Sequence, residues 1–194
     1  MNKNLKVSII SMKDTGGGAF VAAYRLFLAI QKYGQSSDML VQVKNTKNIN
    51  VVCPIGKKDK FYYLLRVSLT RCIFFFFGDK NNPDQTLALF NSGWSKKINQ
   101  NQTDIVNLHW VGGEMISIAD IANISKPIIW TFHDMWAFSG INHVTYEDQN
   151  FLDSNQVTKN SFINLNLNAI KIKNKSWTLP MHIVTPSNWL ASYV

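Results

Sequence analysis

Charged residues are scarce in this sequence, and acidic ones are the scarcer of the two signs. Only 16% of the 194 residues carry a charge, and 20 Lys and Arg stand against 12 Asp and Glu, giving a formal net charge of +8. Disordered chains combine low hydrophobicity with high charge, whereas 46% of this chain is hydrophobic and 12% is aromatic. The composition therefore excludes a disordered chain, and the length suits one folded domain.

Cysteine is nearly absent as well. Cys53 and Cys72 are the only two, and neither lies in a CxxC or another metal-ligand spacing, so at most one disulfide could form. The N-terminal segment MNKNLKVSIIS has too short an apolar run for a signal peptide. We therefore expect a reduced, cytoplasmic protein.

The sequence has no apolar run long enough to cross a membrane. FYYLLRVSLTRCIFFFFG, residues 61–78, is interrupted by Arg66 and Arg71 and falls short of the ~20 apolar residues that a span needs. One interpretation is a helix buried in the core. The other is a peripheral contact of residues 57–78 with the inner face of the membrane. This second interpretation uses the lysines beside the run, which are Lys57, Lys58 and Lys60.

The surplus of positive charge admits three classes of partner: nucleic acid, an anionic membrane surface or a phosphorylated small ligand. Most lysines are scattered among asparagines, as in KNTKNIN and KIKNKS, which also suits a basic surface that is merely solvated. An Arg-rich arm, a zinc finger and an aromatic RNA-binding signature are all missing from the sequence. We therefore expect no nucleic-acid partner.

Short β-branched segments alternate with helical patterns along the chain. This alternation predicts an α/β fold, a Rossmann-like, mainly parallel sheet with helices on both faces. Residues 86–101 and 166–177 fit more than one kind of structure, and the polar residues 139–164 predict a long surface loop. The predicted strands are 5–11, 37–44, 50–55, 103–110, 126–132 and 181–186, and the predicted helices are 19–34, 61–78, 114–125 and a last one opening at Ser187.

Glycine, polar and aromatic residues collect where four of the predicted strands end. Ligands of open parallel sheets bind outside the carboxyl ends of the strands, and the opposite ends here carry ordinary turn residues. We therefore predict a binding site at this edge. Its candidate residues are Gly16, Gly17 and Gly18 after the first strand, His109, Trp110, Gly112 and Gly113 after 103–108, His133, Asp134 and Trp136 after 126–132, and Ser187 after 181–186.

The glycine cluster at 16–18 lies between a predicted strand and a predicted helix. Glycines allow a close backbone approach to a ligand, and a helix N-terminus favours phosphate. The spacing is neither GxGxxG nor a P-loop, and a tight turn is the alternative. Asp38 stands at the start of a strand, where the acid that binds the ribose of NAD would not lie, so NAD is rejected.

His109 and His133 each follow an apolar strand, and two such histidines facing one glycine loop favour a site over two structural groups. A metal site built from His133, Asp134 and His143 would match no standard ligand spacing, so we expect no metal. Ser187 lacks the GxSxG elbow of a hydrolase nucleophile.

Three stretches, in this order, resemble the N-terminal half of family-4 glycosyltransferases of the two-Rossmann-domain (GT-B) type. They are DTGGGAFVAAYRLFLAIQKYGQSSDMLV, DIVNLHWVGGEMISIADIANISKPIIWTFHDMWAFSGINH and IVTPSNWLASYV, whereas residues 45–100 match poorly. The resemblance implies transfer of a sugar from a nucleotide-sugar donor to a glycan or lipid-linked acceptor, with retention of anomeric configuration, in bacterial surface polysaccharide synthesis. No cofactor beyond the donor substrate is implied.

The resemblance also implies roles for the candidate residues. The glycines 16–18 would face the donor phosphates, and His133 would be the catalytic histidine that hydrogen-bonds the donor sugar at the reacting centre. His109 matches a cleft-edge residue, while Asp134 and Trp136 would shape the acceptor side. Backbone and basic groups, without a metal, would stabilise the leaving nucleoside diphosphate.

The sequence departs from the family pattern in two ways. Relatives often carry a cysteine-rich loop after HDMWAFSG, and here that loop has no cysteine. In the family the chain continues beyond SNWLASYV into a C-terminal domain that holds most of the nucleotide and a pair of glutamates. We therefore expect residues 1–194 to be the acceptor-side domain, inactive alone. The alternatives are a non-catalytic binding module or remnant, or one half of a split enzyme whose C-terminal half is separately encoded.

Overall fold

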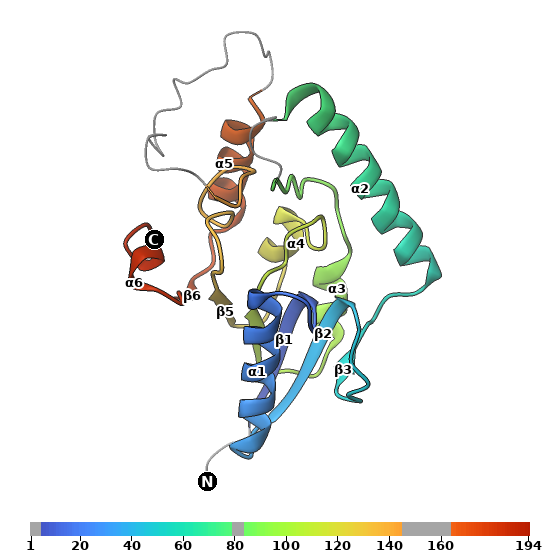
Figure 1. Cartoon of the computed structure of the whole chain (residues 1–194), viewed down its shortest axis with the longest axis vertical. Helices are drawn as coiled ribbons and strands as arrows, with labels where there is room; N and C mark the ends of the chain where they lie inside the picture. The colour runs from blue at the N-terminus through green and yellow to red at the C-terminus, as the bar shows by residue number, and fades with distance from the viewer. Residues whose placement is uncertain (1–4, 79–83, 145–163) are drawn as a thin grey trace.

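A computed structural model describes residues 5–78, 84–144 and 164–194 of the chain, and it confirms the α/β, Rossmann-like fold (Figure 1). Within these residues, parallel strands form one sheet in the order β3-β2-β1-β4-β5-β6. The strands are β1 (Lys6–Lys13), β2 (Ser36–Val43), β3 (Val51–Val52), β4 (Ile105–Leu108), β5 (Ile128–Thr131) and β6 (Met181–Val184), and the helices are α1 (Gly18–Lys32), α2 (Lys57–Phe77), α3 (Trp94–Gln100), α4 (Ile118–Ala122), α5 (Leu165–Ser176) and α6 (Asn188–Ala191).

One face of the sheet is covered by α1, which lies across β1 and β2 (Figure 1). Side chains of a strand alternate between the two faces, and those on this face of β1 and β2 are apolar. Ala23 and Phe27 of α1 pack against Ile9 and Met39, and all four are fully buried. The helical spacing of the predicted segment 19–34 is thus explained by one apolar stripe that faces the sheet.

The opposite face carries the larger core. Ile10 and Leu40 alternate with the residues under α1, and together with Val106 and Trp130 they pack against residues of α3, α4 and α6. From these helices Trp94, Ile98, Ile118, Ile121 and Leu190 enter this core. Helices therefore lie on both faces of the sheet, as predicted.

The two ambiguous segments contain helices. Residues 94–100 form α3 after an irregular stretch, and α5 covers most of 166–177. Asn164 caps α5, because its side chain accepts a hydrogen bond from the backbone N–H of Leu167 at 3.0 Å. Most of the loop predicted at 139–164 lies outside the described residues.

Two predicted elements are shorter than expected. The strand at 50–55 is reduced to Val51–Val52, with Pro54, which has no backbone N–H to donate, just beyond it. The helix at 114–125 begins only at Ile118, because Glu114 has a positive φ of 62° and its carboxylate accepts from the backbone N–H groups of Leu87 and Ala88.

The apolar helix α2 flanks the body of the protein and begins four residues before the predicted 61–78 (Figure 1). Its residues Tyr63, Ile73 and Phe74 are partly buried, whereas most of its other apolar side chains are exposed. Of the helices in the described ranges, none combines the length and the apolar character needed to span a bilayer. Because most of these apolar side chains are exposed, the interpretation of this segment as a helix buried in the core is wrong.

Candidate functional site

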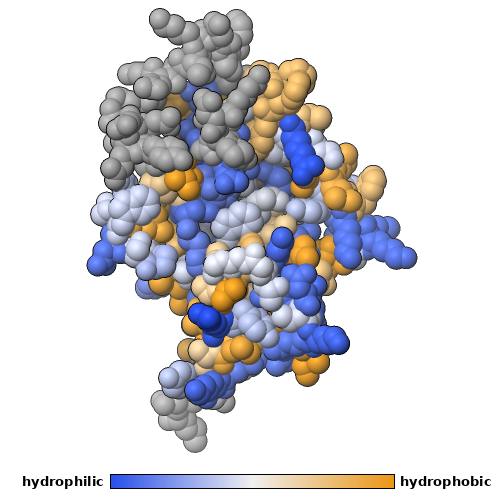
Figure 2. Space-filling view, viewed as in Figure 1, coloured by the Kyte–Doolittle hydropathy of each residue, from blue (hydrophilic) through white to orange (hydrophobic). Residues whose placement is uncertain are grey.

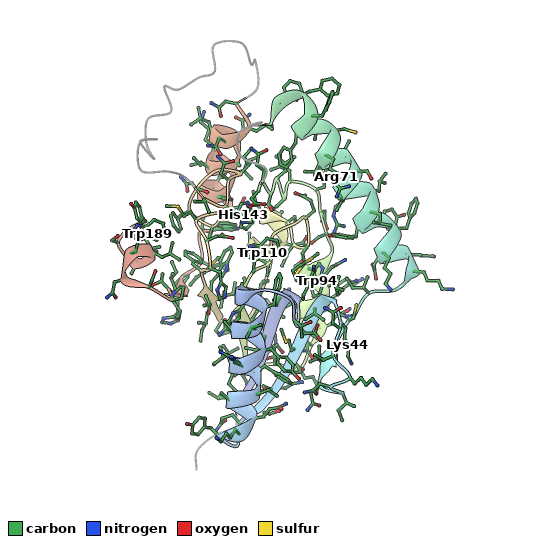
Figure 3. All side chains as sticks on the ribbon, in the orientation of Figure 1. Lys44, Arg71, Trp94, Trp110, His143 and Trp189 are labelled. Atoms are coloured by element: carbon green, nitrogen blue, oxygen red, sulfur yellow. The ribbon has the colours of Figure 1, made fainter. Side chains whose placement is uncertain are left out.

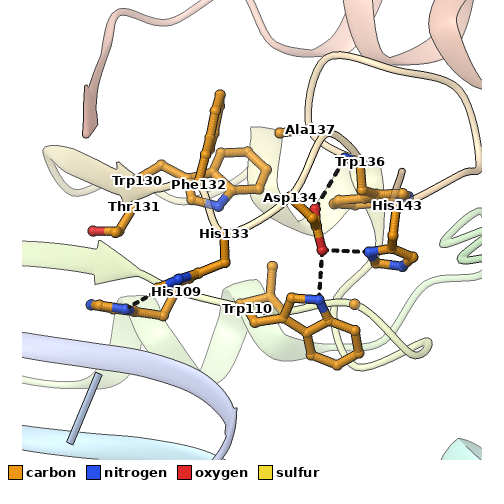
Figure 4. Close-up of a pocket in the computed structure, with 12 residues that line it drawn as sticks. His109, Trp110, Trp130, Thr131, Phe132, His133, Asp134, Trp136, Ala137 and His143 are labelled. Atoms are coloured by element: carbon orange, nitrogen blue, oxygen red, sulfur yellow. Dashed lines mark hydrogen bonds and ion pairs between the residues drawn. The ribbon is translucent and has the colours of Figure 1, made fainter. Parts of the chain in front are cut away.

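β4 and β5 lie side by side and bring two histidines together at their carboxyl ends. His109 follows Leu108 and His133 follows Phe132, and their rings stack with a centroid separation of 5.1 Å. Nδ1 of His109 and Nε2 of His133 share one hydrogen bond of 2.9 Å (Figure 4). The prediction that both histidines lie on one edge of the sheet is confirmed by this contact.

Both imidazoles are held in the neutral form. Burial lowers the pKa of His109 to about 3, and the neighbouring His133 acts in the same direction. Burial also lowers the pKa of His133, although the nearby Asp134 opposes the effect. Since a neutral imidazole has one N–H donor and one acceptor nitrogen, the shared hydrogen bond leaves each ring one further nitrogen.

Within the part of the chain that the structure describes, these second nitrogens have no hydrogen-bond partner. Nε2 of His109 is buried, and burying an unpaired N–H costs more than burying an unpaired acceptor. We therefore assign the proton of the shared bond to Nδ1 of His109, so that its buried Nε2 carries only a lone pair. His133, which is half-buried, then presents its Nδ1–H as a donor at the rim of the site.

Asp134 anchors a second polar group beside the histidine pair. Its Oδ2 accepts from the indole N–H of Trp110 at 2.7 Å and from Nδ1 of His143 at 2.5 Å. Its Oδ1 accepts from the backbone N–H of Trp136 at 3.0 Å. The carboxylate thus joins Trp110, His143 and Trp136 around one point, and the dashed lines of Figure 4 mark all three bonds.

The far nitrogen of His143 completes this group. Nε2 lies 2.7 Å from Oγ1 of Thr86, and that oxygen also accepts from the backbone N–H of Gly113 at 2.9 Å. With Nδ1–H donating to Asp134, Nε2 accepts the hydroxyl proton of Thr86. We call Asp134, Trp110, His143 and Thr86 together the Asp134 network. It resembles a nucleophile–histidine–carboxylate arrangement, but Thr86 is 1% exposed and cannot meet a substrate.

Aromatic packing closes the Asp134 network. The ring of His143 stacks between Trp110, at 5.3 Å, and Trp136, at 6.4 Å. Gly112 lies against this stack, and a Cβ there would come within 2.8 Å of Cε1 of His143. Gly113 has a positive φ of 63°, which suits glycine. Trp110 and His143 lie close together beyond the strand ends in Figure 3.

A buried lysine from α5 holds the turn that follows the site. The Lys173 ammonium donates to the carbonyls of Trp136, Ser139 and Gly140, and it lies 4.0 Å from the centre of the Trp136 ring. Burial lowers the pKa of Lys173 to about 7, while Asp134 opposes this shift. Since Lys173 is 37 residues from Trp136, no sequence pattern indicated this contact.

The glycine loop lies at the same edge, at the end of β1. Gly16 has a positive φ of 98°, and a Cβ at Gly16 or Gly18 would meet nothing within 4 Å. Gly17 is the N-cap of α1 and has no side chain to satisfy the first backbone N–H groups. Phe20 of the first turn packs edge-on against Trp110, with ring centroids 5.6 Å apart, and so links this loop to the histidine side.

Two neighbouring loops are tied together by Asp14, which is not among the candidate residues of the sequence analysis. Its carboxylate accepts from the backbone N–H groups of Asn45 and Thr46 and from the Thr46 hydroxyl. Burial acts to raise the pKa of Asp14, but these hydrogen bonds outweigh it and the pKa is lowered. The carboxyl ends of β1 and β2 are thereby held at a fixed separation.

The predicted residues that follow β4 and β5, except Gly113, line one small cavity. Its volume of about 10 Å³ is close to the minimum for one water molecule. A sugar ring cannot enter it, so a ligand must lie over the rim, where the half-buried His133 is partly accessible. The cavity is lined, among others, by His109, Trp110, Gly112, His133, Asp134, Trp136 and His143, the last of which was considered in the sequence only as a metal ligand.

Ser187 was the remaining candidate residue, and it lies at the start of α6. Ser187 caps α6, since its side chain accepts from the backbone N–H of Leu190. The described residues contain no group of three His, Cys, Asp or Glu side chains placed to hold a metal ion. Cys53 and Cys72 are free thiols.

Comparisons with known proteins returned no matching family model, no matching curated protein and no matching solved structure.

Proposed function

We propose that this chain is the acceptor-side half of a retaining glycosyltransferase, which moves a sugar from a nucleotide-sugar donor to a glycan or lipid-linked acceptor. One observation carries the proposal: a pair of neutral histidines, each with one nitrogen that has no partner in the described residues, lies at the carboxyl edge of a parallel sheet, beside an uncapped glycine loop. The resemblance of these same stretches to family-4 enzymes supports it.

In this proposal His133 is the residue that touches the reacting sugar. A neutral imidazole with Nδ1–H at the rim donates a hydrogen bond to a sugar hydroxyl, and it does not need to exchange a proton. His109 acts through His133, because the 2.9 Å hydrogen bond between them fixes which nitrogen of His133 carries the proton. His109 is therefore a positioning residue.

The glycine loop at 16–18 is proposed to face the donor phosphates. The N-terminus of α1 offers backbone N–H groups without a capping side chain, and a helix N-terminus favours negative charge. The same groups would stabilise the leaving nucleoside diphosphate as its charge develops. The open space above Gly16 and Gly18 leaves room for that approach.

The Asp134 network is proposed to shape the acceptor side through Trp110 and Trp136 rather than to take part in the chemistry. All the polar side-chain atoms described for it are already paired. The proposal places the protein in the cytoplasm, and at the inner face of the membrane if the acceptor is lipid-linked. In family-4 enzymes a second domain holds most of the nucleotide, so residues 1–194 are proposed to need such a domain for sugar transfer.

A second candidate function is one half of a split enzyme, or a non-catalytic binding module. It is favoured by an uncovered apolar surface next to the site. Ile183 and Val184 of β6 are 46% and 47% exposed, and Trp189 of α6 is 51% exposed. Another polypeptide that packs on this surface would bury these side chains.

Saturation-transfer NMR on the full chain tests the proposal. The probes are UDP-glucose, UDP-N-acetylglucosamine and GDP-mannose. We expect weak binding of at least one probe and no turnover, loss of the sugar-proton signals in His133→Ala, and no loss in the control His182→Ala, which changes an exposed histidine of β6. Absence of binding for every probe, or equal losses in both variants, would contradict the proposal.

A further inference from the structure

The helix α2 has two unlike sides. Its inner side is fixed to the protein: the Tyr63 hydroxyl donates to the carbonyl of Gly113 at 3.2 Å, and the Arg66 guanidinium donates to the carbonyls of Asn91 and Glu114. Arg66 is therefore turned toward the protein, and of the two arginines that interrupt the apolar run only Arg71 is exposed. The inner side thus contacts Gly113 and Glu114, which follow the candidate-site residues of β4 in the chain.

The outer side is apolar and uncovered. Phe61 is 64% exposed, Phe75 is 74% exposed and Phe76 is 73% exposed. Exposed apolar surface of this extent marks an interaction site in a folded protein. Figure 2 shows apolar colour over the upper part of α2 and hydrophilic side chains at its lower end. The other apolar side chains exposed on this helix are Tyr62, Leu64, Leu65, Leu69 and Phe77.

The charge on this exposed surface has one sign. Lys57, Lys58, Lys60 and Arg71 are exposed. The single acid of the helix, Asp59, pairs with Lys97 at 3.3 Å and accepts from the backbone N–H of Gly56. A second copy of the same surface would set cations against cations with no acid to pair them. An anionic surface complements both the charge and the apolar side chains.

We propose that α2 docks on the surface of an anionic lipid membrane, lying in the plane of the interface. A helix of 21 residues is about 32 Å long at 1.5 Å per residue. With aromatic side chains inserted and lysines among the headgroups, it has the composition of an interfacial helix. The proposal does not depend on sugar transfer, although docking here would bring the site edge close to the lipid headgroups.

Cys72 gives a direct probe of insertion, because this exposed thiol lies on the outer side of α2. In a Cys53→Ser background the thiol can carry an environment-sensitive fluorophore. We expect a blue shift with phosphatidylcholine vesicles that contain 30% phosphatidylglycerol, and a much smaller one with pure phosphatidylcholine. The same label at Tyr33→Cys in a Cys53→Ser/Cys72→Ser background, on the exposed end of α1, should not shift.

Vesicle co-sedimentation tests which residues carry the binding. Near an anionic surface each lysine contributes several-fold in affinity, so Lys57→Glu/Lys58→Glu/Lys60→Glu should bind at least tenfold more weakly. Phe75→Ser/Phe76→Ser should also lose binding. The matched controls are Lys32→Glu/Lys44→Glu/Lys47→Glu for charge and Tyr33→Ser/Ile49→Ser for exposed apolar area, all away from α2.

Several outcomes would overturn the proposal. They are no binding to anionic vesicles, equal binding to neutral ones, or equal losses in the control variants. A concentration-dependent dimer that Phe75→Ser/Phe76→Ser abolishes, without vesicle binding, would assign the surface to a second copy instead. Thermal unfolding of each variant, compared with the wild type, separates lost binding from lost folding.

Discussion

Two histidine-centred groups lie at the same edge of the sheet, and they differ in how fully their polar atoms are paired. In the Asp134 network both nitrogens of His143 have partners, one on Asp134 and one on Thr86. In the pair formed by His109 and His133, only the facing nitrogens have a partner among residues 5–78, 84–144 and 164–194. The first group therefore has a structural role, whereas the second has nitrogens that can still form a hydrogen bond with a ligand.

This contrast shows how residues that bind a ligand can be distinguished from residues that only stabilise the site. A buried polar network is stable when every member is satisfied, and such a group has nothing left to offer a ligand. An unpaired nitrogen costs stability, and the cost is explained when a ligand supplies the missing partner. The following predictions test whether the two groups differ in this way.

The largest effect that we expect from a single substitution is on stability, from removing the centre of the Asp134 network. Asp134→Ala leaves the indole N–H of Trp110, Nδ1 of His143 and the backbone N–H of Trp136 without their acceptor. We expect a loss of about 3 kcal/mol in the free energy of unfolding. Urea denaturation followed by tryptophan fluorescence measures it, and a loss below that of an exposed control, Asp84→Ala, would contradict the account.

A smaller loss is expected from the other end of the same network. Thr86→Val keeps the shape of the side chain but unpairs Nε2 of His143 and the backbone N–H of Gly113. The free energy of unfolding should fall by about 2 kcal/mol. Thr178→Val, at an exposed position after α5, is the control and should change stability little.

The pH dependence of stability should report the histidine pair. The pKa of His109 is about 3 when folded and about 6.5 when unfolded, so between these values the unfolded chain binds the extra proton. Stability therefore falls as pH drops from 6.5 toward 3, by up to about 1.4 kcal/mol per pH unit.

Urea midpoints from pH 4 to 6.5 measure this dependence. His109→Gln should lose this contribution to the slope, whereas the exposed His182→Gln should keep the wild-type slope. Equal slopes for the wild type and His109→Gln would show that His109 does not bury a neutral imidazole.

The smallest expected effect on stability comes from His133→Ala. His133 is half-buried and makes one side-chain hydrogen bond in the described residues, so we expect a loss of about 1 kcal/mol or less. Binding of nucleotide-sugar probes should nevertheless be lost. A variant that loses stability strongly while it keeps binding would reverse the contrast between the two groups.

The sheet and the position of the histidines could be predicted from the sequence because both follow from local rules. Alternating strands and helices predict parallel pairing, and parallel strands place His109 and His133 on one edge. The partners within that edge could not be predicted. Thr86 and His143 meet across 57 residues, and nothing in the pattern around Thr86 or Lys173 indicates which side chain each will contact.

The same limit applies to the apolar helix. Its composition fitted both a core helix and a membrane contact, because periodicity cannot show which sides a neighbour covers. The structure decides that the outer side is uncovered and that Arg66 points inward. Side-chain direction depends on the packing of α2 against Gly113 and Glu114, which are about 50 residues away in sequence.

Nitrogen-15 NMR of the histidine rings tests the central claim most directly, because it reports the proton on each nitrogen in the free and ligand-bound protein. We predict that neutral His133 carries its proton on Nδ1, that this signal shifts when UDP-glucose, UDP-N-acetylglucosamine or GDP-mannose is added, and that the signals of His143 stay in place. A shift of His143 equal to that of His133, or no shift of His133 with any probe, would contradict the account.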